Sequence, residues 1–111
     1  MIIKIILDEC LPKNLKYRIE ELNNQFFVKT VPEMGWASLS NGDLLAVLEN
    51  QFDVFITSDR NLSFQQAISK YSIQVVLLKA KTNIYEDLLP LVQKSEKIIH
   101  NHKKGHFIEV E

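Results

Sequence analysis

Acidic side chains that could bind a metal ion stand beside three predicted elements of the chain. Asp8 directly follows an apolar run at residues 2–7, and Asp59 follows a second apolar run at residues 54–57. Asp43 stands near the start of a predicted helix that precedes the second run. Gathering like charges raises the free energy of ionising each of them, and a divalent cation such as Mg²⁺ or Mn²⁺, which prefers oxygen ligands, removes that penalty. Such a centre favours phosphodiester hydrolysis, because a bound metal activates water and stabilises charge on the phosphate.

Each acid also has an ordinary structural explanation. Asp43 lies three residues after Ser40, the spacing of a capping box at a helix start. Asp59 could be the N-cap of the following helix. Asp8 is harder to explain in this way. With Pro12 as the first helical residue, Asp8 lies outside the helix and has no capping role.

Strand and helix patterns alternate along the whole chain. The predicted strands cover residues 2–7, 26–31, 54–57, 74–78 and 107–110, and the predicted helices lie within residues 12–22, 42–50, 61–71 and 83–99. This alternation predicts one α/β domain over residues 1–111, with three layers (α/β/α) and a mostly parallel sheet of about five strands. Ligands of such sheets bind beyond the carboxyl ends of the strands. Asp8 and Asp59 are therefore expected at one edge, whereas Asp53, which precedes its strand, is expected at the opposite edge.

Four segments together resemble the compact bacterial PIN-like proteins, a branch of the PIN-domain ribonuclease superfamily that includes VapC-type toxins. They are IILDECLP at residues 5–12, EMGW at 33–36, NGDLL at 41–45 and DVFITSDRNL at 53–62. The match runs in order through nearly the whole chain. It implies a parallel PIN-like sheet flanked by helices, and Mg²⁺- or Mn²⁺-dependent cleavage of RNA. It often implies a toxin role with a neighbouring antitoxin protein as partner.

The resemblance also assigns roles to single residues. Asp8 and Asp59 match the acidic metal ligands that follow the first strand and lie in the Thr-x-Asp motif. Asp43 stands where the family pattern more often has Glu. These three acids are thus predicted to be both the catalytic residues and the metal ligands. Thr57 or Ser58 is predicted to orient the nucleophilic water or a ligand by hydrogen bonding.

The remaining predicted site residues surround these acids. Glu9 and Asn61 are expected to support the metal ligands, although Asn61 stands where PIN domains usually have a further acidic residue. Lys13 and Arg60 follow the acidic loops and are predicted to bind substrate phosphates. Trp36 could stack on a base, but a packing role in the core or at a dimer contact is favoured.

Composition limits the classes of function. With 46% hydrophobic and 24% charged residues, the chain has the balance of a soluble globular protein. Its single cysteine, Cys10, excludes an intrachain disulfide and favours a reducing cytoplasm. No apolar run is long enough for a secretory signal or a membrane span. The net charge of −1 excludes a protein that binds nucleic acid mainly through an overall basic surface.

These features leave three hypotheses. The leading one is a metal-dependent endoribonuclease that acts on RNA, with a homodimer as one option for its assembly. The second is a catalytically weak or inactive PIN-like domain that binds RNA or a protein, and both Asn61 and the lack of a basic surplus favour it. The third is a receiver-like signalling domain, with Asp59 as the phosphorylated residue and Lys79 as its basic partner. The order of the motifs along the chain favours the PIN-like hypotheses over the third.

Overall fold

The chain forms a five-stranded, all-parallel sheet in the order β2-β1-β3-β4-β5. The computed structural model describes residues 1–60 and 68–111. The strands are β1 (Ile3–Leu7), β2 (Phe26–Thr30), β3 (Val54–Thr57), β4 (Gln74–Leu78) and β5 (Phe107–Val110). The described helices are α1 (Leu15–Leu22), α2 (Asn41–Leu48), α4 (Tyr85–Lys94) and α5 (Glu96–His100), with a 3₁₀ turn, η1, at Ile68–Lys70. The predicted α/β class and parallel sheet are confirmed.

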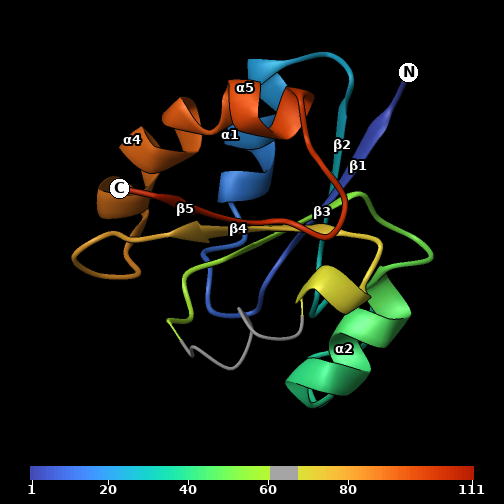
Figure 1. The fold of residues 1–111 in the computed structure, drawn as a ribbon. Coiled ribbons are helices and arrows are strands. Elements are labelled where there is room, and N and C mark those ends of the chain that lie inside the picture. The colour runs from blue at the N-terminus through green and yellow to red at the C-terminus, as the bar shows by residue number, and fades with distance from the viewer. Residues whose placement is uncertain (61–67) are drawn as a thin grey trace.

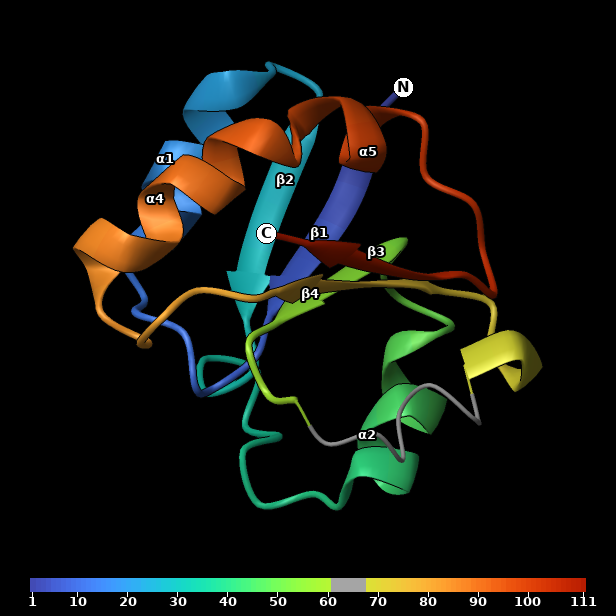
Figure 2. The same ribbon diagram turned by 60° about the vertical axis from the view of Figure 1, so that its left-hand side comes forward.

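Helices cover both faces of the sheet, which makes three layers. Alternate residues of a strand point to opposite faces. In β3, Val54 and Ile56 belong to the core beneath α1, α4 and α5, whereas Phe55 belongs to the core beneath α2. Figures 1 and 2 show α1, α4 and α5 on one side of the sheet and α2 on the other. All four residues of β3 are buried, which explains its uninterrupted apolar sequence before Thr57.

The sheet has its topological switch point between β1 and β3. The chain leaves β1 for β2 on one side of it and later returns to place β3 on the other side. Crevices at such points, beyond the carboxyl ends of the strands, are where ligands of open α/β sheets bind. The residues that follow Leu7 and Thr57 therefore flank the position at which this fold is most suited to hold a ligand.

The C-terminal helical region differs from the prediction of one helix at residues 83–99. Two helices form, and Ser95 lies between them, fully buried. Its hydroxyl donates to the carbonyl of Val92 at 2.7 Å, and its N–H is shared between the carbonyls of Leu91 and Val92. Shared donors of this kind are common at helix ends. The single-helix prediction is wrong because the apolar periodicity continues through a serine that ends the helix locally.

Two helix starts also differ from the predicted ones. Pro12 accepts the N–H of Leu15 in a turn before α1, so it precedes the helix instead of opening it. The predicted helix at residues 83–99 begins later than expected, because α4 starts at Tyr85; before it, the Thr82 hydroxyl accepts the N–H of Ile84 and donates to Asp87. Of the predicted helix at residues 61–71, residues 61–67 lie outside the described part of the chain. None of the described helices is both long and apolar enough to cross a membrane.

Replacing Phe55 by alanine is expected to lower the free energy of unfolding by about 3–5 kcal/mol, because the side chain is fully buried and leaves a cavity. Phe27→Ala on β2 is the matched control. Phe27 is 41% exposed, so its loss should cost clearly less. Urea unfolding followed by circular dichroism measures both changes. Equal losses for the two variants would contradict the assignment of Phe55 to the core.

Candidate active site

Asp8 is fixed at the switch point by backbone and side-chain hydrogen bonds. Its N–H donates to the carbonyl of Ile56 at 2.9 Å, which extends the pairing of β1 and β3 by one residue. One carboxylate oxygen accepts the N–H of Glu9 at 2.8 Å. The other accepts the hydroxyl proton of Thr57 at 2.7 Å. The carboxylate is therefore held in one orientation while the side chain stays partly exposed.

Thr57 connects the two acidic segments. It is the last residue of β3 and is fully buried. Its hydroxyl donates its one proton to Asp8 and accepts the N–H of Asp59 at 3.0 Å. A buried hydroxyl without partners would be costly, and here both of its neighbours lie in the acidic loops. Thr57 thus positions Asp8 and Asp59 relative to each other, and its only proton is committed to the carboxylate.

Cys10 is part of this cluster, a role that its sequence position alone did not suggest. Its sulfur lies 3.2 Å from the Ser58 hydroxyl and 3.6 Å from the second carboxylate oxygen of Asp8. A turn closed by a hydrogen bond from the N–H of Leu11 to the carbonyl of Asp8 brings it back over the strand end. The sulfur of Cys10 therefore packs on polar atoms.

Asp8 and Asp59 line one pocket with a volume of about 310 Å³. Its other lining residues are Glu9, Cys10, Ala37, Leu39, Asn41, Leu44, Ser58, Arg60 and Asn83. Two post-strand acids therefore meet at the expected edge of the sheet. Asp53 lies at the opposite edge, as expected, where it accepts the backbone N–H of Lys4 at 2.9 Å.

Asn41 and Asn83 line the pocket and were not identified from the sequence. Asn41 is the first residue of α2, and Asn83 lies in the loop after β4. Their amide oxygens are further hard donors of the type that divalent cations accept. Only the strand order could have revealed Asn83, because it places β4 next to β3 and so brings this loop beside Asp59.

Asp43 is not among the residues that line this pocket. It is exposed in the first turn of α2, and its N–H donates to the hydroxyl of Ser40, the N-cap, at 3.4 Å. Asn41 and Leu44 do line the pocket, and residues three apart share one face of a helix. At about 100° of rotation per residue, Asp43 points to a different side of α2 than these two.

A second pocket, of about 490 Å³, adjoins the first and is basic. Ser58, Arg60 and Asn83 line both pockets, and Lys79 and Lys81 line the second. The Arg60 guanidinium donates to the carbonyl of Ala80, which anchors this side chain at the boundary between the two. An acidic centre thus lies beside a local cluster of cations, although the net charge of the chain is negative.

Lys79 is held by acids of β5 and the C-terminus. Its ammonium group lies 3.0 Å from a carboxylate oxygen of Glu109 and 3.8 Å from one of Glu111. The hydrogen bond and charge of Glu109, with the charge of Glu111, raise the pKa of Lys79. A receiver-like site would need Lys79 to serve Asp59 instead, so this arrangement disfavours the receiver-like hypothesis.

Three predicted site residues lie elsewhere or cannot be placed. Lys13 is exposed and lines a different pocket, together with Lys16 and Glu33. Trp36 packs edge-to-face on Phe52, with ring centroids 6.3 Å apart, which agrees with the packing interpretation. Asn61 lies outside the described residues.

The donor set at the pocket suits a hydrated Mg²⁺ or Mn²⁺ ion. Within residues 1–60 and 68–111, no three His, Cys, Asp or Glu side chains are grouped so that they could hold a metal together. Mg²⁺, however, is typically bound by one or two carboxylates and keeps several waters or takes substrate phosphates. In the same part of the chain no Lys or Arg forms an ion pair with Asp8. Its charge therefore remains available to a cation.

No protein-family model, curated protein or solved structure matches the chain. The PIN-like resemblance therefore rests on the sequence motifs alone. The structure adds the position of those motifs: the segments that contain Asp8 and Asp59 follow adjacent strands and border the same pocket.

A double-mutant cycle between Asp8 and Thr57 is expected to show coupling of about 0.5–3 kcal/mol, because each variant removes one partner of the same hydrogen bond. The variants are Asp8→Ala and Thr57→Val, singly and together, and urea unfolding gives the free energies. The control cycle pairs Thr57→Val with Asp53→Asn at the opposite edge, for which the effects should add. Additive effects for Asp8 and Thr57 would show that the hydrogen bond contributes nothing.

Proposed function

We propose that this protein is a Mg²⁺- or Mn²⁺-dependent endoribonuclease. One observation carries the proposal: two acids that follow adjacent parallel strands, Asp8 and Asp59, line one pocket at the switch point of the sheet, beside a cluster of cations. This combination suits a phosphodiester, whose negative charge needs cations close to the position at which its bond is cleaved. The PIN-like motifs favour RNA as the substrate and extend the proposal to a toxin with a neighbouring antitoxin.

Several residues in and beside the two pockets have a defined part in this proposal. Asp8 and Asp59 would hold the metal, with Glu9 in support. The bound metal would supply an activated water and would neutralise charge on the phosphate. Thr57 keeps the Asp8 carboxylate in place, and Ser58, which lines the pocket, is the hydroxyl better placed to orient water or substrate. Arg60 and Lys81 would bind the phosphates of neighbouring nucleotides in the second pocket.

A second candidate function is a binding module without strong catalysis. The observation in its favour is the position of Asp43, which leaves two of the three predicted ligands at the pocket. Asn61, where the family usually has an acid, also favours it. In this case the same basic pocket would bind RNA, or an acidic surface of a protein partner, and no bond would be cleaved.

Purified protein is expected to cleave single-stranded RNA with Mn²⁺ or Mg²⁺ and to stop when EDTA is added. A direct metal ligand accounts for several kcal/mol of the barrier, so Asp8→Asn or Asp59→Asn should lower the rate by roughly 100-fold or more. Cleavage of an end-labelled RNA, resolved on a denaturing gel, measures the rate of each variant.

Two further variants make this test specific. Asp53→Asn, at the opposite edge of the sheet, should leave the rate unchanged. Asp43→Asn decides whether Asp43 is a ligand: a rate close to wild type agrees with its position outside the pocket. Folded protein that cleaves no RNA with either metal would refute the enzyme and leave the binding module, for which Arg60→Ala should weaken RNA binding.

Divalent metal is expected to raise the melting temperature. Binding to the folded state stabilises it by about 2.7 kcal/mol when the free ion is at a hundredfold excess over its dissociation constant. Differential scanning calorimetry with millimolar Mn²⁺, Mg²⁺ or EDTA measures the shift, and Asp8→Asn should abolish it while Asp53→Asn should not. An identical melt in all three conditions would exclude a metal site, whatever the activity.

A further inference from the structure

The edge strand β2 has its outward-facing N–H groups occupied. In a strand, residues that bond to the neighbouring strand alternate with residues that face away from it. The N–H of Val31 donates to the carbonyl of Leu7 in β1. The N–H groups of Thr30, Val28 and Phe26 therefore point away from β1, toward the open edge of the sheet. An edge of this kind normally presents unpaired groups that can bind a further strand.

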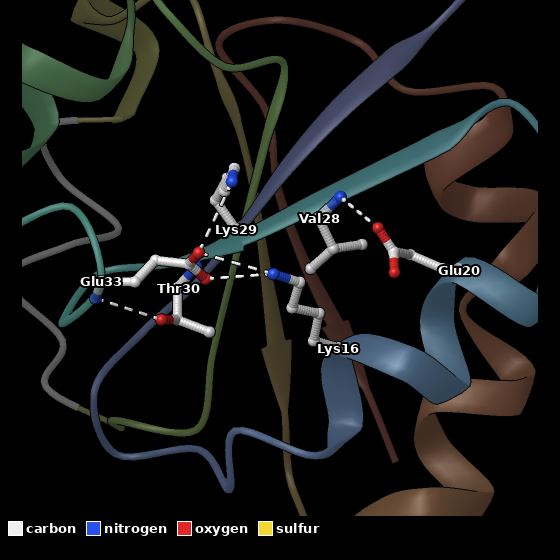
Figure 3. A network of polar contacts seen from close by, with 6 residues as sticks. All are labelled: Lys16, Glu20, Val28, Lys29, Thr30 and Glu33. Atoms are coloured by element: carbon white, nitrogen blue, oxygen red, sulfur yellow. Dashed lines mark hydrogen bonds and ion pairs between the residues drawn. The ribbon is translucent and has the colours of Figure 1, made fainter.

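Two glutamates occupy this edge from different parts of the chain (Figure 3). Glu20 of α1 accepts the N–H of Val28 at 3.2 Å. Glu33, in the turn after β2, accepts the N–H of Thr30 at 2.8 Å. The third outward donor, the N–H of Phe26, bonds to the carbonyl of Asn23 at 3.0 Å. Each N–H that a new strand would need is already bonded within the chain.

Glu33 is held firmly in this position. Lys16 of α1 reaches both of its carboxylate oxygens at 3.4 Å, and Lys29 lies 3.6 Å away (Figure 3). Its own N–H donates to the hydroxyl of Thr30. Partial burial raises the pKa of Glu33, but hydrogen bonding to Thr30 and the hydrogen bond and charge of Lys16 together lower it below its ordinary value. Glu33 is thus ionised at neutral pH, and charge-assisted hydrogen bonds of this type are stronger than neutral ones.

We propose that Glu20 and Glu33 close the β2 edge against strand addition by a second copy of this chain. The strand they protect begins with Phe26, Phe27 and Val28, residue types that favour strand pairing. Two identical edges can pair about a twofold axis. A second copy of the chain is therefore the partner we consider, because it is always present at the same concentration as the first. To pair, such a strand would have to displace both carboxylates and leave their charges beside its own peptide groups.

The test compares the assembly of variants by sedimentation velocity over a range of concentrations. Glu20→Ala combined with Glu33→Ala should form a larger, concentration-dependent assembly than wild type. Glu20→Gln combined with Glu33→Gln should behave as wild type, because the amide oxygen can still accept the N–H. Glu21→Ala is the matched control: it lies on the same helix but pairs with Arg18. A folded double alanine variant that sediments as wild type would overturn the proposal.

A second measurement applies to the wild-type chain and does not depend on the folding of a variant. Amide protons bonded to a carboxylate shift when that carboxylate is protonated. In a pH titration followed by amide NMR, the signal of Thr30 should therefore shift as Glu33 is protonated. The signals of Phe27 and Lys29, whose N–H groups face β1, should move much less. Equal behaviour of these three amides would show that Glu33 does not occupy the edge in solution, and would also overturn the proposal.

Discussion

Apart from the exposed Lys4, β1 and β3 are buried on both faces, which confines their chemistry to the residues that follow them. Within these strands a polar side chain would need partners that the surrounding aliphatic side chains cannot give. Thr57 is the exception, fully buried at the end of β3, and its hydroxyl meets its needs from Asp8 on one side and from the N–H of Asp59 on the other. The candidate site therefore follows from a buried hydroxyl that has to be satisfied at the point where two adjacent strands end.

The sequence predicts the parts of the site that depend on strand ends. An apolar run followed by an acid places Asp8 and Asp59 at the same edge of any parallel sheet, and Asp53, before its strand, at the other. It does not predict which loops are neighbours. Asn83 reaches the pocket because β4 lies beside β3, and strand order depends on the packing of the whole chain. The rotation of α2, which brings Asn41 and not Asp43 to the pocket, is decided in the same way.

The prediction of helix ends from local sequence patterns failed where a single residue interrupts a helix within a continuous apolar periodicity. The apolar positions of the C-terminal region continue across Ser95 at helical spacing, so the pattern alone predicts one helix. Ser95 is fully buried and bonds to the carbonyl of Val92, and the chain begins a new helix after it. Whether a serine is buried depends on tertiary packing, and the neighbouring residues in the sequence do not indicate it. Of the capping box predicted at Ser40 and Asp43, the hydrogen bond from the Asp43 N–H to the Ser40 hydroxyl forms, because both groups lie within one turn.

Carboxylates serve two opposite purposes at the two places where this chain concentrates them. At the β2 edge, Glu33 accepts a backbone N–H and is neutralised by Lys16 and Lys29, so its charge is compensated within the fold. At the switch point, Asp8 also accepts a backbone N–H, but its other partners are the neutral hydroxyl of Thr57 and the thiol of Cys10, and no cation of the described residues pairs with it. A carboxylate has about four acceptor positions, and those of Asp8 are only partly used. Both carboxylates are anchored by a backbone N–H. What distinguishes Asp8 from Glu33 is that no Lys or Arg of the described residues pairs with it. It is the physical reason to expect a metal ion beside Asp8 and none beside Glu33.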